Sequence, residues 1–380
     1  MKVPCYISAT GLVTPLGFSV KDNFNLLLKD ISAIQKHKDG TISATSFYAA
    51  MLSEEKIDAQ FQQLGNPKKF TKLEKMMLLS LGQTLASSAV KISAKTALIV
   101  ATTKGNIDAL EQDSSFEEKR AYLPELAKKL VAFYNFTTQP IIVSNACVSG
   151  ILAVAVAKRI LTTDLYDNAV IVAGDLVTKF TLSGFQSFQA LSDSPCKPYS
   201  KYRNGITLGE GAASVFVSKE KPDSNAVQIL GDGTSNDANH ISGPSRTGEG
   251  LYRSILTAMT EAQLEANEID FISAHGTATL YNDEMESIAF TRRRLQHVPL
   301  HSLKGVFGHT LGASGLLETV IGLEMMHQKT MLPSVGFDVV GVSKPLHILR
   351  QLQHQPIDVL LKTASGFGGC NTAVLFKKVS

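Results

Sequence analysis

Short runs of β-branched and small apolar residues alternate along this chain with longer segments of helical pattern. The runs that predict buried strands are residues 97–101, 140–143, 169–173, 213–217, 228–230, 271–274 and 359–361. The segments that predict helices are residues 123–133, 149–162, 251–266 and 313–327. Continuous apolar strands separated by helices are typical of sheets that are covered on both faces. The sequence therefore predicts an α/β fold.

Two short motifs occur twice. Residues 147–152 (CVSGIL) resemble residues 312–317 (GASGLL), and each opens a predicted buried helix. Residues 209–217 (GEGAASVFV) resemble residues 368–376 (GGCNTAVLF), and each is a glycine turn that enters a strand. Two matches in the same order, each separated by nearly half the chain, favour a duplicated domain over chance. The polar segment 219–225 predicts a boundary between two units, residues 1–220 and 221–380.

Composition excludes several classes of protein. Hydrophobic residues make up 44% of the 380 residues, which is too many for a disordered chain. The net charge of +3 is too small for a dedicated nucleic-acid-binding protein. Four scattered cysteines do not form a disulfide framework. Because the chain has no long apolar stretch, we expect no signal peptide, no membrane insertion and a cytoplasmic enzyme.

Cys147 is the candidate nucleophile. It lies in residues 141–150 (IIVSNACVSG), between a predicted strand and a predicted helix. Backbone N–H groups and the helix dipole at such a position favour the thiolate over the thiol. The alternative, a buried structural cysteine, stays open from this segment alone. Cys5, Cys196 and Cys370 do not precede a helix of this kind, and we interpret them as structural.

Two of the nine histidines stand apart from the others. His275 follows a predicted strand and precedes small hydroxyl residues, and His309 lies in the glycine-rich segment 302–315 (SLKGVFGHTLGASG). Small residues let a substrate approach the backbone closely. His297 and His301 have the spacing of a helical metal pair, but Pro299 breaks such a helix, so we expect no metal site.

One thiolate and two imidazoles suit acyl transfer to cysteine followed by a step that places negative charge on a carbonyl oxygen. Two neutral histidines can hold such an enolate by N–H donation without a metal ion. The sequence has no Walker A motif, dinucleotide-binding fingerprint or zinc signature. We therefore expect an acyltransferase without a bound cofactor.

These residues lie in motifs that resemble a known family, the elongating β-ketoacyl-acyl-carrier-protein synthases. The resemblance covers essentially the whole chain. The motifs follow the family's order: TGLVTPLG (10–17), NACVSG (145–150), SGFQSFQALS (183–192), KPYSKYRNGITLGEGA (197–212), SNDANHISGP (235–244), AHGTATLYND (274–283), KGVFGH (304–309) and GFGGCN (366–371). The resemblance implies a thiolase-like fold, with two duplicated βαβαβαββ halves in a five-layer αβαβα sandwich.

The resemblance also implies a catalytic role for each matching residue. Cys147 would accept the growing acyl chain from a carrier-protein thioester. His275 and His309 would promote decarboxylation of malonyl carrier protein and hold the enolate, which attacks the acyl group on the cysteine. The residues that would organise and support this triad are Lys304, Glu318, Asp283 and Glu286.

Further matching residues would bind the substrate. The backbone N–H groups of the nucleophile and of Phe367 would form the oxyanion hole. Phe367 would act as a mobile gate, given freedom by Gly366 and Gly368. Thr277 and Thr279 would bind the phosphopantetheine arm of the carrier protein, which delivers the substrate in place of a cofactor.

Carrier proteins of this family are acidic, so the resemblance implies a basic docking patch. Lys68 and Lys69, in the basic segment 67–75 (PKKFTKLEK), match the region that the family uses, and Lys201 and Arg203 are further candidates. A solvated basic face is the alternative. We expect an acyl carrier protein as partner and a dimer, formed with a second copy or with a related ketosynthase or chain-length factor.

The sequence departs from the family pattern at several positions. Asn204 replaces the usual Asp, Ser365 replaces a bulkier residue, and Cys370 and Asn145 stand where Thr is common. The chain is also short between about residues 105 and 140. These differences suggest a synthase specialised for polyenes, pigments or polyketides.

Three other functions are alternatives to that of an elongating synthase. Thiolases need a second catalytic cysteine near the C-terminus, for which Cys370 is a superficial candidate. Initiating ketosynthases use Cys-His-Asn, and His309 argues against them. Non-catalytic chain-length factors lack the nucleophile, so Cys147 argues against that role. An active subunit that requires such a factor as its partner stays open.

Overall fold

The computed structural model describes residues 3–88, 90–222, 226–237 and 243–379. The principal elements of the first half are β1 (Tyr6–Val13), α3 (Lys72–Ser88), β4 (Thr96–Ala101), α4 (Leu123–Tyr134), β5 (Ile141–Val143), α5 (Ser149–Leu161), β6 (Asn168–Asp175) and β8 (Gly211–Ser218). Those of the second half are β9 (Val227–Asn236), α7 (Glu249–Ala262), β10 (Phe271–Ser273), α8 (Leu280–Arg292), β11 (Leu300–His301), α10 (Ser314–Gln328), β12 (Val359–Gly366) and β13 (Cys370–Lys378).

Both halves have the same strand topology. The first sheet has the order β5-β4-β6-β8-β1, and the second has the order β11-β10-β12-β13-β9. In each sheet the first three strands are parallel and the last two pair antiparallel. The two sheets meet only where β1 pairs with β9, through Tyr6 with Gln228 and Ile7 with Val227. The repeated motifs therefore lie in a structure whose two halves are built alike.

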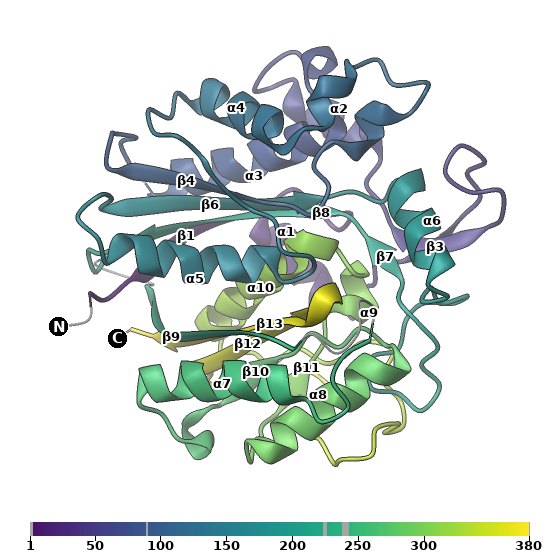
Figure 1. The fold of residues 1–380 in the computed structure, drawn as a ribbon, viewed down its shortest axis with the longest axis vertical. Coiled ribbons are helices and arrows are strands. Elements are labelled where there is room, and N and C mark those ends of the chain that lie inside the picture. Colours follow the sequence, from purple (N-terminus) through teal and green to yellow (C-terminus); the bar gives the residue numbers. More distant parts are fainter. Residues whose placement is uncertain (1–2, 89, 223–225, 238–242, 380) are drawn as a thin grey trace.

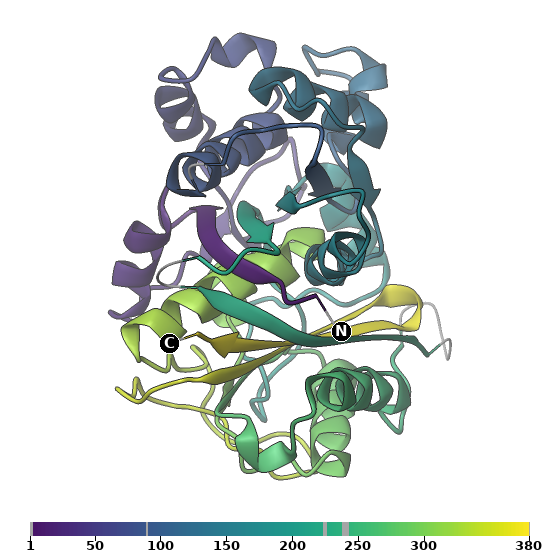
Figure 2. The same ribbon diagram turned by 90° about the vertical axis from the view of Figure 1, so that its left-hand side faces the viewer.

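The elements form five layers, which Figure 1 shows edge-on. Helices α3 and α4 cover the outer face of the first sheet, and α7 and α8 cover the outer face of the second. Helices α5 and α10 pack against each other between the two sheets. Figure 2 shows the same stack after a quarter turn. The predicted α/β, thiolase-like five-layer arrangement is confirmed.

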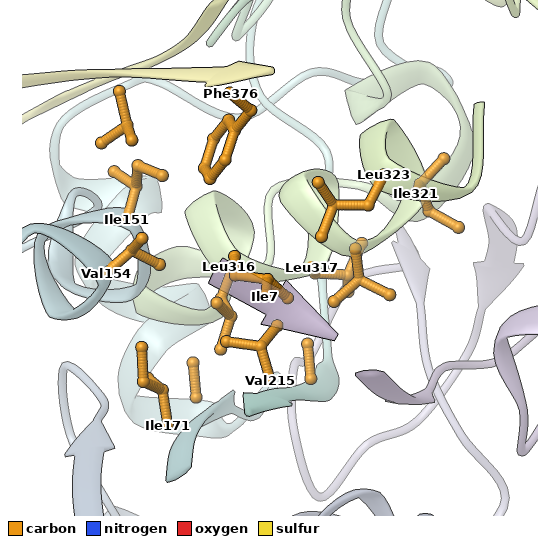
Figure 3. Close-up of a cluster of buried hydrophobic side chains, with 14 of the residues drawn as sticks. Ile7, Ile151, Val154, Ile171, Val215, Leu316, Leu317, Ile321, Leu323 and Phe376 are labelled. Carbon is orange, nitrogen blue, oxygen red and sulfur yellow. The ribbon is translucent and has the colours of Figure 1, made fainter. Parts of the chain in front are cut away.

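The central layer is a continuous apolar core that draws on both halves (Figure 3). Its side chains come from β1, α5, β6, β8, α10 and β13, and ten of them are labelled: Ile7, Ile151, Val154, Ile171, Val215, Leu316, Leu317, Ile321, Leu323 and Phe376. Because α5 and α10 are covered on both sides, they carry small and apolar residues all round rather than a single apolar stripe.

Every predicted strand run overlaps a strand of the two sheets, and every predicted helical segment overlaps a helix. The largest element that the pattern did not indicate is α3. Nine of its residues are buried on several faces, so its apolar residues show no helical stripe. The predicted boundary segment 219–225 lies between β8 and β9, and residues 223–225 of it are outside the described part.

Smaller elements complete the chain around this framework. They are α1 (Val20–Leu27), β2 (Gln35–His37), β3 (Phe47–Ala50), α2 (Glu54–Phe61), α6 (Lys179–Ser187), β7 (Leu208–Gly209), α9 (Lys304–Phe307) and six short 3₁₀ turns. Strands β2, β3 and β7 form a separate small sheet. Within the described residues, none of the helices has the length and apolar character needed to span a bilayer.

Candidate active site

Cys147 lies on a sharp turn between β5 and α5. Ala146, just before it, has a φ of +44°, which a residue with a side chain rarely adopts. Ser149 stabilises this turn, because its Oγ accepts from the N–H of Asn145 (2.8 Å) and donates to the carbonyl of Ala146 (2.6 Å). Strain of this kind is typical of turns that present a nucleophile.

The thiol of Cys147 is protonated at neutral pH, contrary to the expectation from the helix dipole. Only 7% of the residue is exposed, and burial raises the pKa of the thiol to about 12. The nearby Cys370 and Asp175 raise this pKa further, while Lys304 and the backbone N–H of Phe367 lower it. Desolvation of the charged form therefore outweighs the favourable position before α5.

The two histidines lie side by side in the second half. Their ring centroids are 5.2 Å apart and the rings are nearly perpendicular (83°). Burial lowers the pKa of each imidazole well below its usual value, and Lys304 lowers both further. Both rings are therefore neutral at pH 7, so each carries one N–H donor and one unprotonated nitrogen.

His309 is held by both halves of the chain. Its backbone N–H donates to the carbonyl of Thr207 (2.7 Å), and its backbone carbonyl accepts from the N–H of Gly209 (3.0 Å). The β7 segment of the first half therefore fixes the backbone of His309. This approach requires glycine, because a Cβ on Gly209 would lie 1.8 Å from the carbonyl oxygen of Phe307. The Nδ1 of His309 is hydrogen-bonded to Ser314 Oγ (3.0 Å).

His275 is held by backbone contacts rather than through its ring. Its N–H donates to Glu286 (2.9 Å), and its carbonyl accepts from Lys304 Nζ (3.0 Å). Its Nδ1 is buried and has no hydrogen-bond partner among the described residues. The residue as a whole lines the cavity beside Cys147.

Asp283 and Glu286 hold the loop that follows β10. Glu286 accepts from the N–H groups of His275 and Gly276 and from the hydroxyl of Tyr199 (2.9 Å). Asp283 accepts from the N–H groups of Tyr199 and Ala278. Both carboxyl groups are buried, which raises their pKa values, that of Asp283 to about 7. Their contacts fit the supporting role inferred from the sequence.

A cavity of about 410 Å³ brings the candidate residues together. Cys147, His275 and His309 line it, and Phe367 lies beside them. The other lining residues that the sequence analysis named are Thr277, Thr279, Asn204, Ser365 and Gly366. The arrangement therefore places a thiol, two neutral imidazoles and two adjacent threonine hydroxyls around one space.

The ring of Phe367 belongs to a cluster of three phenylalanines at this cavity. Its centroid lies 5.6 Å from that of Phe185 and 5.3 Å from that of Phe188. Gly368, which follows the ring, has a φ of +81° and open space around its Cβ position. Glycine adopts this left-handed conformation without the strain that a side chain would cause.

Lys304 and Glu318 form an ion pair beneath the histidines. Lys304 Nζ lies 2.5 Å from Glu318 Oε1, and both side chains are almost completely buried. Burial alone would raise the pKa of Glu318, but Lys304 and Lys362 together bring it below its usual value. Glu318 is therefore a carboxylate between two lysines.

The candidate docking residues differ in their exposure. Lys68, Lys69 and Lys201 are exposed. Arg203 is 6% exposed, and its guanidinium donates to the carbonyls of Ser200, Thr279, Leu280 and Gly341. The prediction that Arg203 is a docking residue is therefore wrong, because the side chain braces the loop next to the cavity.

Two other lysines of the segment 67–75 are also engaged inside the protein. Lys72 pairs with the buried Glu210, and the buried Lys75 pairs with Glu54 and Asp58. Of the motif at 235–244, residues 238–242 lie outside the described part.

Sequence reasoning missed several residues that build the site. Lys362 reaches Glu318 from β12, and Asp175 accepts from Thr102, Thr103 and the N–H of Gly312 (2.7 Å), which ties the end of β6 to the loop before α10. A charged residue at the end of a buried strand could have indicated both. Lys362 follows the predicted strand 359–361, and Asp175 closely follows the predicted strand 169–173.

Comparisons with known proteins agree with this geometry. Residues 4–223 match the family described as "Beta-ketoacyl synthase, N-terminal domain", and residues 226–338 match "Beta-ketoacyl synthase, C-terminal domain". The 3-oxoacyl-[acyl-carrier-protein] synthase 2 of Coxiella burnetii is 27% identical over 408 residues, covering 98% of both chains. A putative mitochondrial 3-oxoacyl-[acyl-carrier-protein] synthase of Schizosaccharomyces pombe is 26% identical over 427 residues, again with 98% of both covered.

Among solved structures, a ketosynthase from Xenorhabdus doucetiae, determined in complex with its chain length factor, has the same fold. Its TM-score is 0.86 at 23% identity, over 99% of this chain and 98% of that one. The two domain matches together span most of the sequence and coincide with the two halves that the strand order reveals. The chain therefore belongs to the β-ketoacyl synthase family.

Proposed function

We propose that the chain catalyses a decarboxylative Claisen condensation. An acyl group on Cys147 would react with the malonyl group of an acyl-carrier-protein thioester and give a β-ketoacyl-acyl-carrier protein. One observation carries this proposal: Cys147, His275 and His309 line one cavity in which burial keeps both imidazoles neutral. The N–H group of a neutral imidazole can stabilise the negative enolate oxygen by hydrogen bonding.

In the first step the sulfur of Cys147 attacks the thioester carbonyl of an acyl carrier. The carbonyl oxygen becomes negative and would be stabilised by the backbone N–H groups of Cys147 and Phe367. The tetrahedral intermediate then releases the carrier thiol, which takes up the proton that the cysteine loses. Because the thiol pKa is about 12, the proton would pass during the attack to the unprotonated nitrogen of a neutral imidazole in the same cavity, which then gives it to the departing carrier thiolate.

In the second step malonyl carrier protein enters the cavity and loses carbon dioxide. The electrons of the broken C–C bond pass to the thioester carbonyl, and N–H groups of His275 and His309 stabilise the resulting enolate. Its carbon attacks the acyl carbonyl on Cys147, and the collapse of this second tetrahedral intermediate expels the cysteine thiolate, which is then reprotonated. Thr277 and Thr279, whose hydroxyls lie 3.0 Å apart at the cavity wall, would bind the phosphopantetheine arm.

The proposal includes two kinds of partner. An acidic acyl carrier protein would dock on the exposed Lys68, Lys69 and Lys201. A second copy of this chain, or a chain-length-factor-like relative, would complete a dimer. Strand β5, which leads directly to Cys147, is the last strand of its sheet. Partner-dependent activity gains support from the Xenorhabdus structure, where a ketosynthase of this fold is in complex with its chain length factor.

The test is intact-mass spectrometry of the purified protein after incubation with saturated and unsaturated acyl-carrier-protein thioesters. We expect an acyl adduct on the unmodified protein and none on Cys147→Ala, and the adduct masses would rank the chains that are accepted. A preference for unsaturated chains would support the hypothesis of a specialised synthase, and full turnover on saturated chains alone would contradict it.

The roles of His309 and Cys147 are tested with the same carrier-protein substrates. His309→Ala should slow decarboxylation of malonyl carrier protein more than it slows acyl loading, and Cys147→Ala should still decarboxylate. Acyl adducts on Cys147→Ala, or continued chain elongation by that variant, would refute the assignment of the nucleophile. If no donor gives an adduct, the measurement is repeated after co-expression with a related subunit, and no adduct there would refute the proposal.

A further inference from the structure

Lys362 is the one lysine of β12 and lies in the interior of the second sheet. Its side chain is fully buried, and it follows the apolar run of Val359 to Leu361. Burial of a lysine charge costs several kcal/mol of lost hydration, and oxygen ligands around the ammonium group can offset this cost. The contacts of its ammonium group therefore indicate what this residue does.

Four oxygen atoms surround the ammonium group. Lys362 Nζ donates to the backbone carbonyls of Ser273 (3.1 Å), Ala274 (3.4 Å) and Thr363 (2.8 Å). It also forms an ion pair with Glu318 Oε2 at 2.6 Å. Three carbonyl oxygens and a carboxylate, with no donor among them, form a cage that requires a cation. Carbonyl oxygens are also the ligands with which proteins replace the hydration shell of potassium.

The cage lies directly behind the catalytic histidines. Lys362 donates hydrogen bonds to the backbone carbonyls of residues 273 and 274, and Lys304 donates to the next carbonyl, that of His275. Glu318 joins the two lysines, because one carboxylate oxygen pairs with each. Three consecutive carbonyls leading into His275 are thus bound by two ammonium groups that share one carboxylate.

The charges of this cluster also act on the imidazoles. Two lysines and one carboxylate leave a net positive charge beneath His275 and His309. Burial is the main cause of the low pKa of both imidazoles, and Lys304 and Lys362 add to it. For Lys362 itself, burial lowers the pKa, while Glu318 and Glu286 oppose that effect.

We propose that Lys362 is a positioning residue that serves as a covalently attached monovalent cation, completing the oxygen cage formed by Ser273, Ala274, Thr363 and Glu318. Through the cage it orients Lys304 and the backbone of His275, and it holds positive charge behind the enolate. The expected effect of Lys362 on decarboxylation rests on the proposed condensation. The expectation that the oxygen cage holds a cation rests on the contacts of the cage alone.

The experiment compares two variants in matched salts. Lys362→Ala removes the ammonium group and leaves the cage empty, whereas Lys362→Met fills the same space without charge. Decarboxylation of malonyl carrier protein and acyl loading of Cys147 are measured in choline chloride, potassium chloride and ammonium chloride at one ionic strength. Lys378→Met is the matched control, because this lysine of β13 also donates to a backbone carbonyl, that of Met326, away from the site.

We expect Lys362→Ala in choline chloride to lose at least tenfold in decarboxylation with little change in acyl loading. Potassium or ammonium ions should restore most of the loss and should raise the Tm of this variant by about 3 °C or more, as expected for binding to the folded state alone. Lys362→Met should lose activity in all three salts. The unmodified protein and Lys378→Met should show the same activity and Tm in each salt.

Several outcomes would overturn the inference. One is decarboxylation by Lys362→Ala within twofold of the unmodified protein in choline chloride. Another is an equal loss in Lys362→Ala and Lys362→Met that no salt relieves. If Lys362→Ala does not fold in any salt, the Lys362→Met variant becomes the test. Decarboxylation by Lys362→Met at the rate of the unmodified protein would then contradict the positioning role of Lys362. If the unmodified protein has no condensing activity, the proposed function fails, while the salt-dependent Tm of Lys362→Ala still tests the cage.

Discussion

At the scale of single residues, burial decides the charge states of the candidate site. Cys147 stands before a helix, where the dipole favours a thiolate, yet burial removes much of the hydration of the charged form and raises the pKa to about 12. The same effect keeps His275 and His309 neutral. Arg203 and Lys75 are also buried. From the sequence both would be interpreted as surface charges, but each has hydrogen-bonding or ion-pair partners inside the folded protein.

The raised pKa of Cys147 predicts how its reactivity depends on pH. The folded thiol titrates near its pKa of about 12, so the thiolate fraction should rise about tenfold per unit between roughly pH 7 and pH 10. The rate of alkylation by iodoacetamide, followed by intact mass, should therefore climb through this range without levelling off. Cys147→Ala supplies the background from the three other buried cysteines. A plateau near neutral pH would contradict this prediction.

At the scale of elements, the repeated glycine motif allows the two central helices to touch. A Cβ on Gly150 in α5 would lie 2.7 Å from the carbonyl oxygen of Gly312, and one on Gly315 in α10 would lie 2.7 Å from the N–H nitrogen of Ile151. The two copies of the motif thus pack against each other's backbone. This close contact brings the start of α5, next to Cys147, beside the start of α10, next to His309.

This contact predicts that Gly150→Ala destabilises the fold. The added methyl group has backbone atoms on two sides, 2.7 and 2.8 Å away, so the helices must separate. Overpacking of this kind costs about 1–3 kcal/mol. Chemical denaturation would measure it. Gly184→Ala in α6 is the matched control, since nothing lies within 4 Å of its Cβ position and alanine should there stabilise the helix by about 0.5–1 kcal/mol. Equal effects of the two changes would contradict the packing argument.

At the scale of the whole molecule, the site exists only because the two halves meet. The first half supplies Cys147 and the β7 segment that holds the backbone of His309, while the second half supplies both histidines and Phe367. The basic surface is also defined at this scale. Of the basic side chains that the sequence offered for docking, Lys68, Lys69 and Lys201 remain exposed once the chain is folded.

We expect Lys68→Glu with Lys69→Glu to weaken docking of an acidic carrier protein. The double change should raise KM for the acyl carrier about tenfold with little effect on kcat, and the effect should shrink at high salt. Lys91→Glu is the control, because Lys91 is also exposed but lies beyond the far end of α3, a helix about 25 Å long. Steady-state kinetics with a carrier-protein substrate would measure both variants. An equal rise in KM for Lys91→Glu would argue for a general charge effect.

The fold class and the order of most elements could be predicted from the amino-acid sequence alone. Apolar runs are local and continuous in strands that are buried on both faces, so segments such as 97–101 and 169–173 are visible without tertiary information. The motifs around Cys147, His275 and His309 were equally readable, because tight turns and close backbone contacts demand particular small residues at fixed positions.

Features that depend on contacts between distant segments could not be predicted in this way. Helix α3 is buried on several faces, so its sequence has no stripe to reveal it. Lys362 and Asp175 belong to the site only because β12 and β6 end beside it, and the pKa of the Cys147 thiol is raised because residues from distant parts of the chain bury it. Local sequence encodes which element forms, whereas desolvation and pairing of charges depend on which elements pack together.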